Sequence, residues 1–487
     1  MSDYDVHRDE NLRRQVGDAY RPIDLFDNDK DCFFCPKCNE QLFSSSARYA
    51  KNKFSKSLVQ ASCAECNEWL YFKLPAIKKK RVYLDQSVIS DLCNVDVTGT
   101  NRIDSTDWRE RLLAKILLAK RLQKASFIVS EIHVQETVPI PHEDTKKACW
   151  RLANSLADGR ISGNFIDAFE YELHQILGFQ STKKLSSPVN CYMDFEIDAW
   201  SIRSPILMTN TWRLRLNHNQ IDFRNASTEN FKKILENQKK QIGLNASVES
   251  CIQHLKNVYL DDLVDGIKYA QRLAATMQMS SYSDNLDQIT EEPLPLDIAN
   301  FPKDNGYGSI IFRAMEDSRD ASKQLATLSK LLEQVELQGI DAFPCIKIQT
   351  VLEGEVLHRW VHGLQANPNK FNENYGSSKF MDISHLVVFL PIVDVLTVDK
   401  VTFNRCDQRP EIKLEFTKYP CKLLLASENQ FGLENWLDDL LAEPETDEFR
   451  CARRLFFGRN LVEEKYHDDQ FISDILDRLE AEKQSSA

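Results

Sequence analysis

VYLDQS, residues 82–87, forms a short apolar segment that ends in an aspartate, and it decides the fold. Three residues with strong strand preference follow the basic run of residues 78–81, so a β-strand is expected here. Asp85 then stands where an open α/β sheet has its C-terminal edge, and ligands of such sheets bind at that edge. An aspartate that caps a helix produces the same string, so this segment needs support from others.

The neighbouring segments indicate a parallel sheet. Residues 105–124 predict a helix, because apolar residues recur on one face and Ser105 or Thr106 can serve as its N-cap. Residues 126–129 predict the next strand, and strand, helix, strand at this spacing is typical of a parallel α/β sheet. Two more strands are predicted at 395–398 and 422–425, and a helix from 434 to 441.

The composition is that of an ordinary globular protein. Of 487 residues, 42% are hydrophobic and 28% are charged, which is enough apolar surface for a sizeable core. No run approaches the roughly 18 apolar residues of a membrane span, and the polar N-terminus does not resemble a secretory signal. We therefore expect a cytoplasmic protein without membrane contact. The net charge of -12 means that nucleic-acid binding would need local basic patches.

Five of the thirteen cysteines crowd between residues 32 and 66. Cys35 and Cys38 form one C-x2-C pair, and Cys63 and Cys66 form a second, which together supply the four sulfurs of a zinc ribbon. Four thiolates leave no open coordination position, so the expected Zn²⁺ is structural. Cys32 is the fifth cysteine of this cluster and could compete with these four as a zinc ligand. Two disulfides are the alternative, which a reducing compartment disfavours.

The loop between the two cysteine pairs is basic. It carries four cations with interleaved aromatic residues and has no acidic residue between Glu40 and Glu65. Such a mixture suits phosphate contact and base stacking, whereas a solvated loop or a protein-contact surface is an equally good interpretation. The predicted nucleic-acid contacts are Arg48, Lys51, Lys53 and Lys56.

Acidic residues also follow the other predicted strands. After residues 128–130, a predicted helix carries Glu136. Further along, Asp382 opens a helix, and the strand at 395–398 leads through Thr397 to Asp399. Each acid alone could be a helix cap or a surface ion pair, but several in this order favour a shared site.

This order of motifs resembles the PIN-like domain. In that family, an acid follows the first strand and a glutamate lies on the next helix. An aspartate then starts a later helix, and T-x-N or T-x-D ends the strand that follows. Asp85 matches the first acid and Ser87 its short polar partner. Glu136, Asp382 and Asp399 match the later acids, with Thr397 before the last. The pattern D-x-x-H, L-P-x-x-D, T-x-D-K is similar to a subgroup of long bacterial proteins, in which Asp394 and Lys400 also lie near the site.

The resemblance implies a metal-dependent endonuclease that hydrolyses phosphodiester bonds, with RNA favoured over single-stranded DNA. Asp85, Asp382 and Asp399 would be the main ligands of Mg²⁺ or Mn²⁺, because these cations prefer oxygen donors. Glu136 would bind a second metal or orient water, and Ser87 and Thr397 would hold the carboxylates. A toxin-like or defence role, and a regulatory protein partner, follow from family analogy alone.

Two histidines near these acids leave two interpretations open. His133 and His385 could contact substrate, but packing or hydrogen bonding is the preferred interpretation.

The expected fold class is α/β, with a PIN-like (Rossmann-like) central parallel sheet, a large helical insertion and a small N-terminal zinc ribbon. The resemblance covers residues 80–140 and 345–443, because 246 positions separate Glu136 from Asp382. The predicted division is a flexible segment at 1–27, the ribbon at 28–78, the first PIN-like half at 79–149, the helical insertion at 150–345, the second half at 346–443 and an acidic, helical tail at 444–487.

Two other functions fit parts of the sequence. A catalytically silent adaptor could use the same ribbon and sheet to bind nucleic acid or protein, but it would not need all four acids. A phosphatase of the haloacid-dehalogenase class would need D-x-D after the first strand, and Ser87 stands at the third position here.

Overall fold

The chain is described by a computed structural model in which the following residues are placed. They are 20–21, 32–35, 37–43, 48–51, 58–63, 65–73, 75–93, 95, 105–137, 140–156, 165–177, 233, 236–242, 245–282, 307–308, 310–311, 321–362, 377–425, 432–446 and 449.

A four-stranded parallel sheet lies at the centre of a mixed α/β unit. Its strand order is β10-β9-β7-β8, where β7 is Lys80–Tyr83, β8 is Ala125–Ile128, β9 is Val395–Val398 and β10 is Lys422–Leu425. The chain leaves β7 toward β8 on one side and later returns to β9 on the other. The C-terminal ends of β7 and β9 therefore form a topological switch point, where open sheets bind their ligands.

Helices cover both faces of the sheet, so its strands are mostly buried and apolar; the exceptions include the exposed first residues of β7 and β10, Lys80 and Lys422. Val82 of β7 and Leu84, which directly follows it, point to one face, whereas Tyr83 points to the other. The first face packs against α2 (Gln86–Cys93), α3 (Trp108–Arg121), α5 (Glu143–Leu156) and α18 (Gly432–Ala442). The second packs against α4 (Glu131–Thr137), α6 (Phe165–Ile176), α13 (Pro344–Val361), α15 (Ser377–Phe389), α16 (Lys400–Gln408) and α17 (Pro410–Phe416).

A buried ion-pair network joins the two sequence-distant halves of the sheet unit. Glu434 of α18 accepts hydrogen bonds from Lys115 and Arg111 of α3, both at 2.9 Å. Lys124, which follows α3, donates to the last carbonyl groups of α18. The predicted elements at residues 80–140 and 345–443 thus belong to one sheet unit, although α3 begins at Trp108 with Asp107 as its N-cap rather than Ser105 or Thr106.

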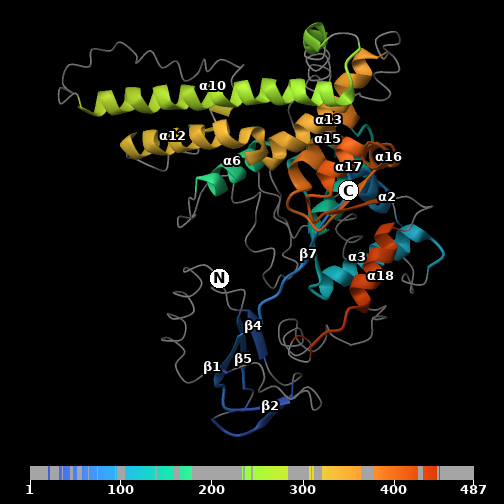
Figure 1. Cartoon of the computed structure of the whole chain (residues 1–487). Coiled ribbons are helices and arrows are strands. Elements are labelled where there is room, and N and C mark those ends of the chain that lie inside the picture. The colour runs from blue at the N-terminus through green and yellow to red at the C-terminus, as the bar shows by residue number, and fades with distance from the viewer. Residues whose placement is uncertain are drawn as a thin grey trace.

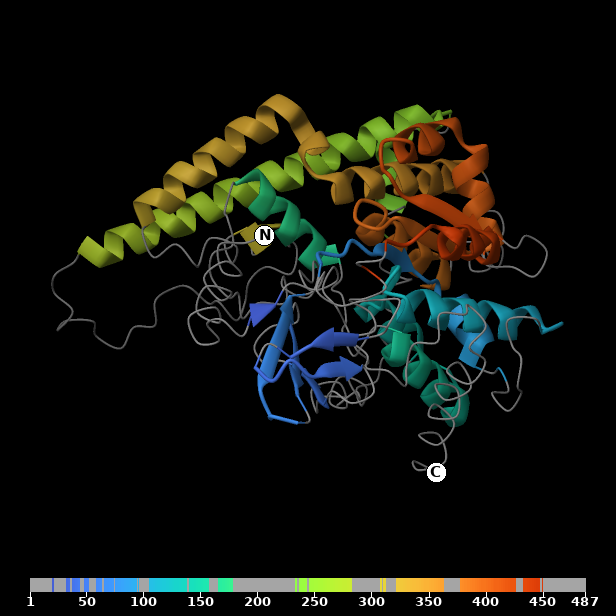
Figure 2. The ribbon, with the colours of Figure 1, turned by 90° about the horizontal axis from the view of Figure 1, so that it is seen from below.

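The helical segment between the halves is not a separate body. α10 (Val248–Tyr282) and α12 (Ala321–Gln338) lie side by side and project from the sheet unit (Figures 1 and 2), and η5 (Gly339–Ala342) leads into α13. α10 has 35 residues, hence a length of about 52 Å. A single apolar core nevertheless contains Ile267 of α10, Phe343, and Tyr83 of β7. The predicted end of the helical insertion, residue 345, is the second residue of α13. Two further helices, α13 and α15, therefore lie between this boundary and Phe389.

α10 and α13 approach each other closely at a glycine. A Cβ atom on Gly354 would lie 2.5 Å from Cγ1 and 2.9 Å from Cα of Ile252. We expect Gly354→Val to lower the free energy of unfolding by about 1–3 kcal/mol or more, because overpacking outweighs the gain in helix preference. Urea unfolding would measure it, with Gln253→Val on the exposed face of α10 as the control; equal stability of the two variants would refute the close approach.

Glu172 of α6 caps α13 from another helix. α13 begins with Pro344, and its N-cap Phe343 has no side-chain acceptor. Glu172 supplies one instead, because its carboxyl oxygens accept from the Cys345 N–H at 2.9 and 3.2 Å. Burial raises the pKa of Glu172 to about 8, although the hydrogen bonds from Cys345 oppose the rise.

This raised pKa predicts a pH-dependent loss of stability. The folded protein holds the Glu172 proton up to about pH 8, whereas the unfolded chain releases it near pH 4.5, so the contribution to stability falls as pH rises through this window. Glu172→Gln keeps an acceptor but no charge. We expect the variant and wild type to unfold at similar temperatures at pH 5 and the variant to be more stable at pH 9, as scanning calorimetry would record. A difference that is the same at both pH values would contradict this.

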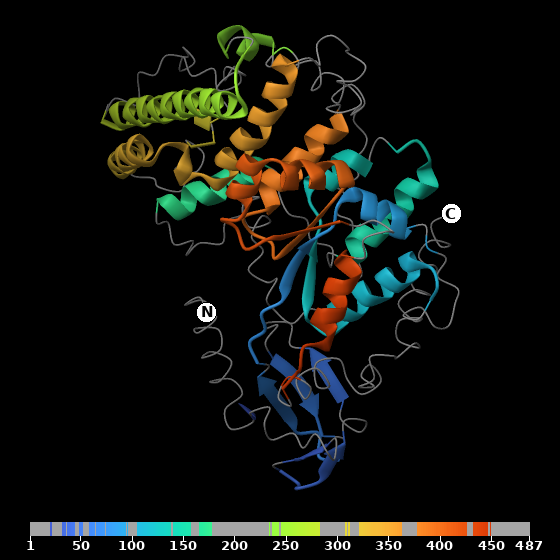
Figure 3. The ribbon, with the colours of Figure 1, turned by 45° about the vertical axis from the view of Figure 1, so that its right-hand side comes forward.

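A small β-rich unit lies at the opposite end of the molecule from α10 (Figures 1 and 3). Its sheet has the order β1-β6-β5-β4, with a separate hairpin of β2 and β3. Their bounds are β1 Tyr20–Arg21, β2 Cys32–Phe34, β3 Gln41–Phe43, β4 Arg48–Lys51, β5 Leu58–Ser62 and β6 Trp69–Lys73. Tyr20–Arg21 pairs in parallel with β6, so part of the segment predicted to be a flexible lead-in belongs to this unit.

Among the helices in the described part of the chain, none combines the length and apolar character that a membrane crossing requires.

Candidate functional site

Asp85 lies at the C-terminal edge of the sheet, directly after β7. Its side chain is buried, and Oδ2 accepts hydrogen bonds from the Ser87 N–H, at 3.1 Å, and from the Ser87 hydroxyl. The backbone N–H of Asp85 donates to Oγ1 of Thr397 at 2.7 Å. Ser87 therefore orients the carboxylate as predicted. Thr397 instead fixes the backbone of Asp85, which corrects the expectation that it holds a carboxylate.

Two further side chains converge on Asp85 from the helices of the opposite face. Glu136 lies on α4 and His385 on α15, and His385 Nε2 is 2.9 Å from Glu136 Oε2. One ligand atom each from Asp85, Glu136 and His385 lie within 4.8 Å of one another. This spacing fits a single cation between two carboxylates and an imidazole.

A buried tyrosine hydroxyl lies behind this group. Tyr83 Oη is 2.7 Å from Ser130 Oγ, 3.1 Å from His133 Nδ1, and in close hydrogen-bond contact with His385 Nδ1. His133 Nε2 donates to the Leu84 carbonyl at 2.6 Å. Burial, together with the charge of His385, lowers the pKa of His133 to about 3, so His133 is a neutral acceptor at Nδ1. These contacts lock the ring of His385 in place.

Asp382 and Asp399 are brought together by a threonine of α16. Thr402 donates its N–H to Asp399 Oδ1 at 2.6 Å and its hydroxyl to Asp382 Oδ2 at 3.2 Å. Asp399 is the N-cap of α16. The structure thus divides the four predicted acids into two neighbouring pairs at one edge: Asp85 with Glu136, and Asp382 with Asp399.

Burial and the charges of neighbouring side chains together set the electrostatics of the site. Burial raises the pKa of Asp85, and the charge of Glu136 adds to the rise, whereas His385 and the Ser87 hydrogen bonds oppose it. Burial alone would lower the pKa of His385, but the charges of Glu136, Asp85 and Asp382 outweigh burial and raise it. A cationic imidazole therefore partly balances the carboxylates, as a bound cation also would.

Asp394 does not belong to this group. It precedes β9, where its Oδ2 accepts from the Arg81 N–H at 2.8 Å and its Oδ1 lies 3.7 Å from Lys80 Nζ. These contacts place it at the N-terminal edge of the sheet, so the expectation that it lies near the other acids is wrong. Lys400 is exposed and opens α16 next to Asp399, as expected.

The sequence interpretation missed three residues of the site: Tyr83, Ser130 and Thr402. It preferred packing or hydrogen bonding for His385, and the hydrogen bonds with Tyr83 and Glu136 agree with this. It did not group His385 with the acids, although a place three positions after Asp382 on one helix puts the two side chains on the same face. Tyr83 gives no signal in the sequence, because any large residue could fill its place in a buried strand.

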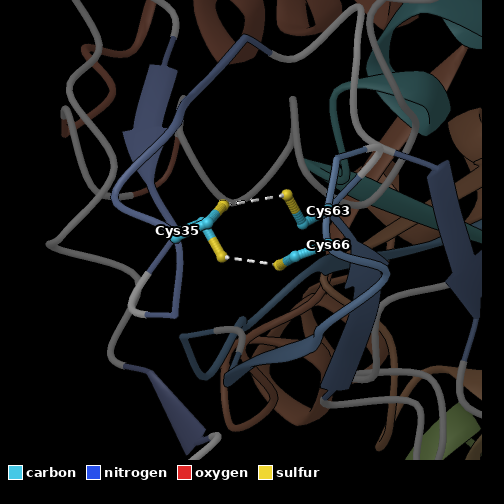
Figure 4. Close-up of side chains that lie close together, drawn as sticks. Cys35, Cys63 and Cys66 are labelled. Carbon is cyan, nitrogen blue, oxygen red and sulfur yellow. Dashed lines mark hydrogen bonds between the residues drawn. The ribbon is translucent and has the colours of Figure 1, made fainter.

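The four cysteines of the two C-x2-C pairs converge in the small β unit. Cys35 Sγ is 3.5 Å from Cys66 Sγ (Figure 4). Cys38 Sγ is 3.8 Å from Cys63 Sγ. Tetrahedral zinc with bonds of about 2.3 Å holds its sulfurs about 3.8 Å apart. The donor set and its spacing therefore fit a structural zinc ion.

The two cysteine knuckles repeat one local structure, CPKCNE at 35–40 and CAECNE at 63–68. In each, the N–H of the first cysteine donates to the carbonyl of the glutamate five positions later, at 2.9 Å in both. Asn39 and Asn67 have positive φ angles of 55° and 56°, which asparagine tolerates well. The turn is thus encoded by the sequence of each knuckle.

The predicted nucleic-acid contacts fall mostly outside the described residues. Lys53 and Lys56 lie beyond them, and Arg48 and Lys51 are described only through the backbone of β4.

The chain matches no protein-family model, and neither a curated protein nor a solved structure is significantly similar to it. The PIN-like resemblance therefore rests on the sequence motifs alone.

Proposed function

We propose that this protein is a metal-dependent nuclease of the PIN-like type, acting in the cytoplasm on RNA or single-stranded DNA. One observation carries the proposal. Four carboxylates from segments up to 314 positions apart in the sequence lie at the switch point of a parallel sheet, where such folds bind ligands.

The carboxylates have distinct tasks in this proposal. Asp85, held by Ser87, and Glu136, held by His385, bind the cation. Asp382 and Asp399, linked through Thr402, complete the acidic edge and orient the attacking water. Lys400, exposed beside Asp399, contacts a phosphate of the substrate. The chemistry that a divalent cation supplies here is activation of water and neutralisation of charge on the phosphate.

The donor set favours Mn²⁺ over Mg²⁺. Oxygen donors suit both ions, but an imidazole beside two carboxylates suits Mn²⁺ better. In its neutral form, His385 is an additional candidate ligand. The three residues whose ligand atoms lie close together, Asp85, Glu136 and His385, therefore differ from the predicted ligands Asp85, Asp382 and Asp399. The cysteine group holds Zn²⁺ and keeps the ribbon folded beside the basic loop, which contacts nucleic acid in this proposal.

The test is a cleavage assay with labelled single-stranded RNA, single-stranded DNA and duplex DNA. Each substrate is incubated with wild type and Mn²⁺, Mg²⁺ or EDTA. Two matched variants, Asp399→Asn and Asp394→Asn, change carboxylates at opposite ends of β9. We expect cleavage with Mn²⁺ or Mg²⁺, none with EDTA, loss in Asp399→Asn and retention in Asp394→Asn. Asparagine keeps the capping and accepting roles at both positions.

Two outcomes would overturn the proposal. Cleavage that persists in EDTA would point to a contaminating or metal-independent enzyme. No cleavage by folded, zinc-loaded protein under any of these conditions would favour an adaptor that binds nucleic acid or protein through the ribbon.

A further inference from the structure

Two cysteines of the sheet unit lie next to each other where α2 packs against α5. Cys93 is the last residue of α2, and Cys149 lies in the middle of α5. Their Sγ atoms are 3.1 Å apart, which is closer than the 3.5 and 3.8 Å that separate two pairs of ribbon thiols. The two cysteines are 56 positions apart in the sequence, so the packing of the two helices brings them together.

The surroundings of this pair differ from those of the ribbon thiols. Within the described part of the chain, no third cysteine, histidine or carboxylate completes a metal-binding group with Cys93 and Cys149. A closed zinc site needs four ligands, and the ribbon supplies all four. The chemistry that two adjacent thiols can perform by themselves is the formation of a disulfide.

The neighbouring thiol makes Cys149 different from other buried cysteines of the chain. Burial raises the pKa of Cys251 to about 11 and that of Cys406 to about 12, so both stay protonated and unreactive at neutral pH. At Cys149, the hydrogen bond with Cys93 lowers the pKa, and this effect outweighs burial. The thiolate is the attacking species in thiol–disulfide exchange, so Cys149 is suited to that step.

Cys93 provides the access to small molecules that Cys149 lacks. Cys149 is fully buried, whereas Cys93 is partly exposed, and its thiol donates to the Ser90 carbonyl at 3.2 Å. An oxidant can therefore react first at Cys93, and Cys149 is then in position to attack the modified sulfur. An accessible thiol beside a second, resolving thiol is typical of redox-sensitive sites.

We propose that Cys93 and Cys149 form a reversible disulfide by exchange with low-molecular-weight disulfides such as glutathione disulfide. In the first exchange, the Cys93 thiolate attacks one sulfur of the oxidant, which gives a mixed disulfide and releases one thiolate. Cys149 then attacks the Cys93 sulfur and releases the second thiolate. The two released thiolates take up the two protons that Cys93 and Cys149 lose, so the protein dithiol is oxidised and one disulfide is reduced to two thiols.

The new bond fastens α2 to α5 and closes a loop that contains α3, β8 and α4. A closed loop restricts the unfolded chain, so the oxidised protein is more stable than the reduced one. In a reducing compartment such a bond is transient, and the site therefore responds to a rise in oxidant. Its formation does not depend on nuclease activity.

The experiment is the oxidation of the full, zinc-loaded chain in buffers with increasing ratios of glutathione disulfide to glutathione. Samples are quenched with acid, unfolded, alkylated and digested with trypsin. Residues 82–102 and 148–151 form two tryptic peptides, and each contains one cysteine of the pair and no other. We expect mass spectrometry to find these two peptides linked in oxidised wild type and separate again after treatment with dithiothreitol.

Two matched variants and a stability measurement test the assignment. Cys93→Ser should lose the link, whereas Cys421→Ser, which removes another partly exposed thiol, should keep it. Oxidation should raise the unfolding temperature of wild type and of Cys421→Ser by about 5 °C or more, and that of Cys93→Ser should not rise.

Three results would overturn the proposal. The first is a folded, oxidised wild type in which Cys93 carries only glutathione and is not linked to Cys149. The second is the absence of any modification of either cysteine in excess glutathione disulfide. The third is an equal rise in unfolding temperature for Cys93→Ser and wild type, which would place the stabilising bond elsewhere.

Discussion

Asp85→Asn should reduce metal-dependent cleavage by more than about 100-fold. Loss of groups that only support metal ligands typically costs about 10- to 100-fold, so loss of a direct ligand should cost more. Asparagine has nearly the same shape and can still accept from Ser87, so the change removes charge and little else. Single-turnover cleavage of labelled RNA at saturating Mn²⁺ measures the effect.

The same substitution should not weaken the fold. Because burial raises the pKa of Asp85, its charged form is less stable in the folded protein than in the unfolded chain. The neutral variant should therefore unfold at the same or a higher temperature without divalent metal. Mn²⁺ should raise the unfolding temperature of wild type but not of the variant.

Asp91→Asn on the exposed side of α2 is the matched control, because it removes a carboxylate six positions away. If both variants lose activity equally, or if Asp85→Asn remains active, Asp85 is not a ligand.

Loss of one zinc ligand should unfold the ribbon and leave the sheet unit intact. The ribbon strands have two to five residues each, which is too little for an apolar core, so metal binding must provide most of its stability. Structural zinc contributes apparent binding free energies of about 10–16 kcal/mol in small domains. We expect Cys63→Ser to contain no zinc where wild type contains one ion per chain.

Limited proteolysis then reports which part unfolds. Cys63→Ser should be cut rapidly between residues 35 and 73, while the fragment that begins near residue 78 keeps the thermal transition of wild type. Cys32→Ser, which leaves both C-x2-C pairs intact, should retain zinc and resist cleavage. Zinc retained by Cys63→Ser, or lost by Cys32→Ser, would show that the ligand set is different.

The ribbon also shows how local signals make prediction possible. Each knuckle is built by contacts within six residues, including the asparagine with positive φ, so the sequence of the knuckle dictates its shape. The same holds for β9 and β10, whose bounds agree with the predicted strands, because β-branched and leucine runs next to turn residues mark them locally.

The error at Asp394 has a different origin. The strand predicted at 395–398 already placed Asp394 at its start and Asp399 at its end, which are about 16 Å apart along an extended chain. The family pattern contains no information about this geometry. A strand direction fixes which edge a residue reaches, and no motif can change that.

The sequence by itself determined the elements, the two cysteine knuckles and the set of acids that follow strands, because periodicity, turn chemistry and ligand spacing act over a few residues. Only the tertiary structure decided which acids share a site. The contacts of Tyr83 with His385, of Asp85 with Thr397 and of His385 with Glu136 join residues 302, 312 and 249 positions apart. Their distances depend on strand order and on how the helices pack across the sheet, and a one-dimensional pattern contains neither.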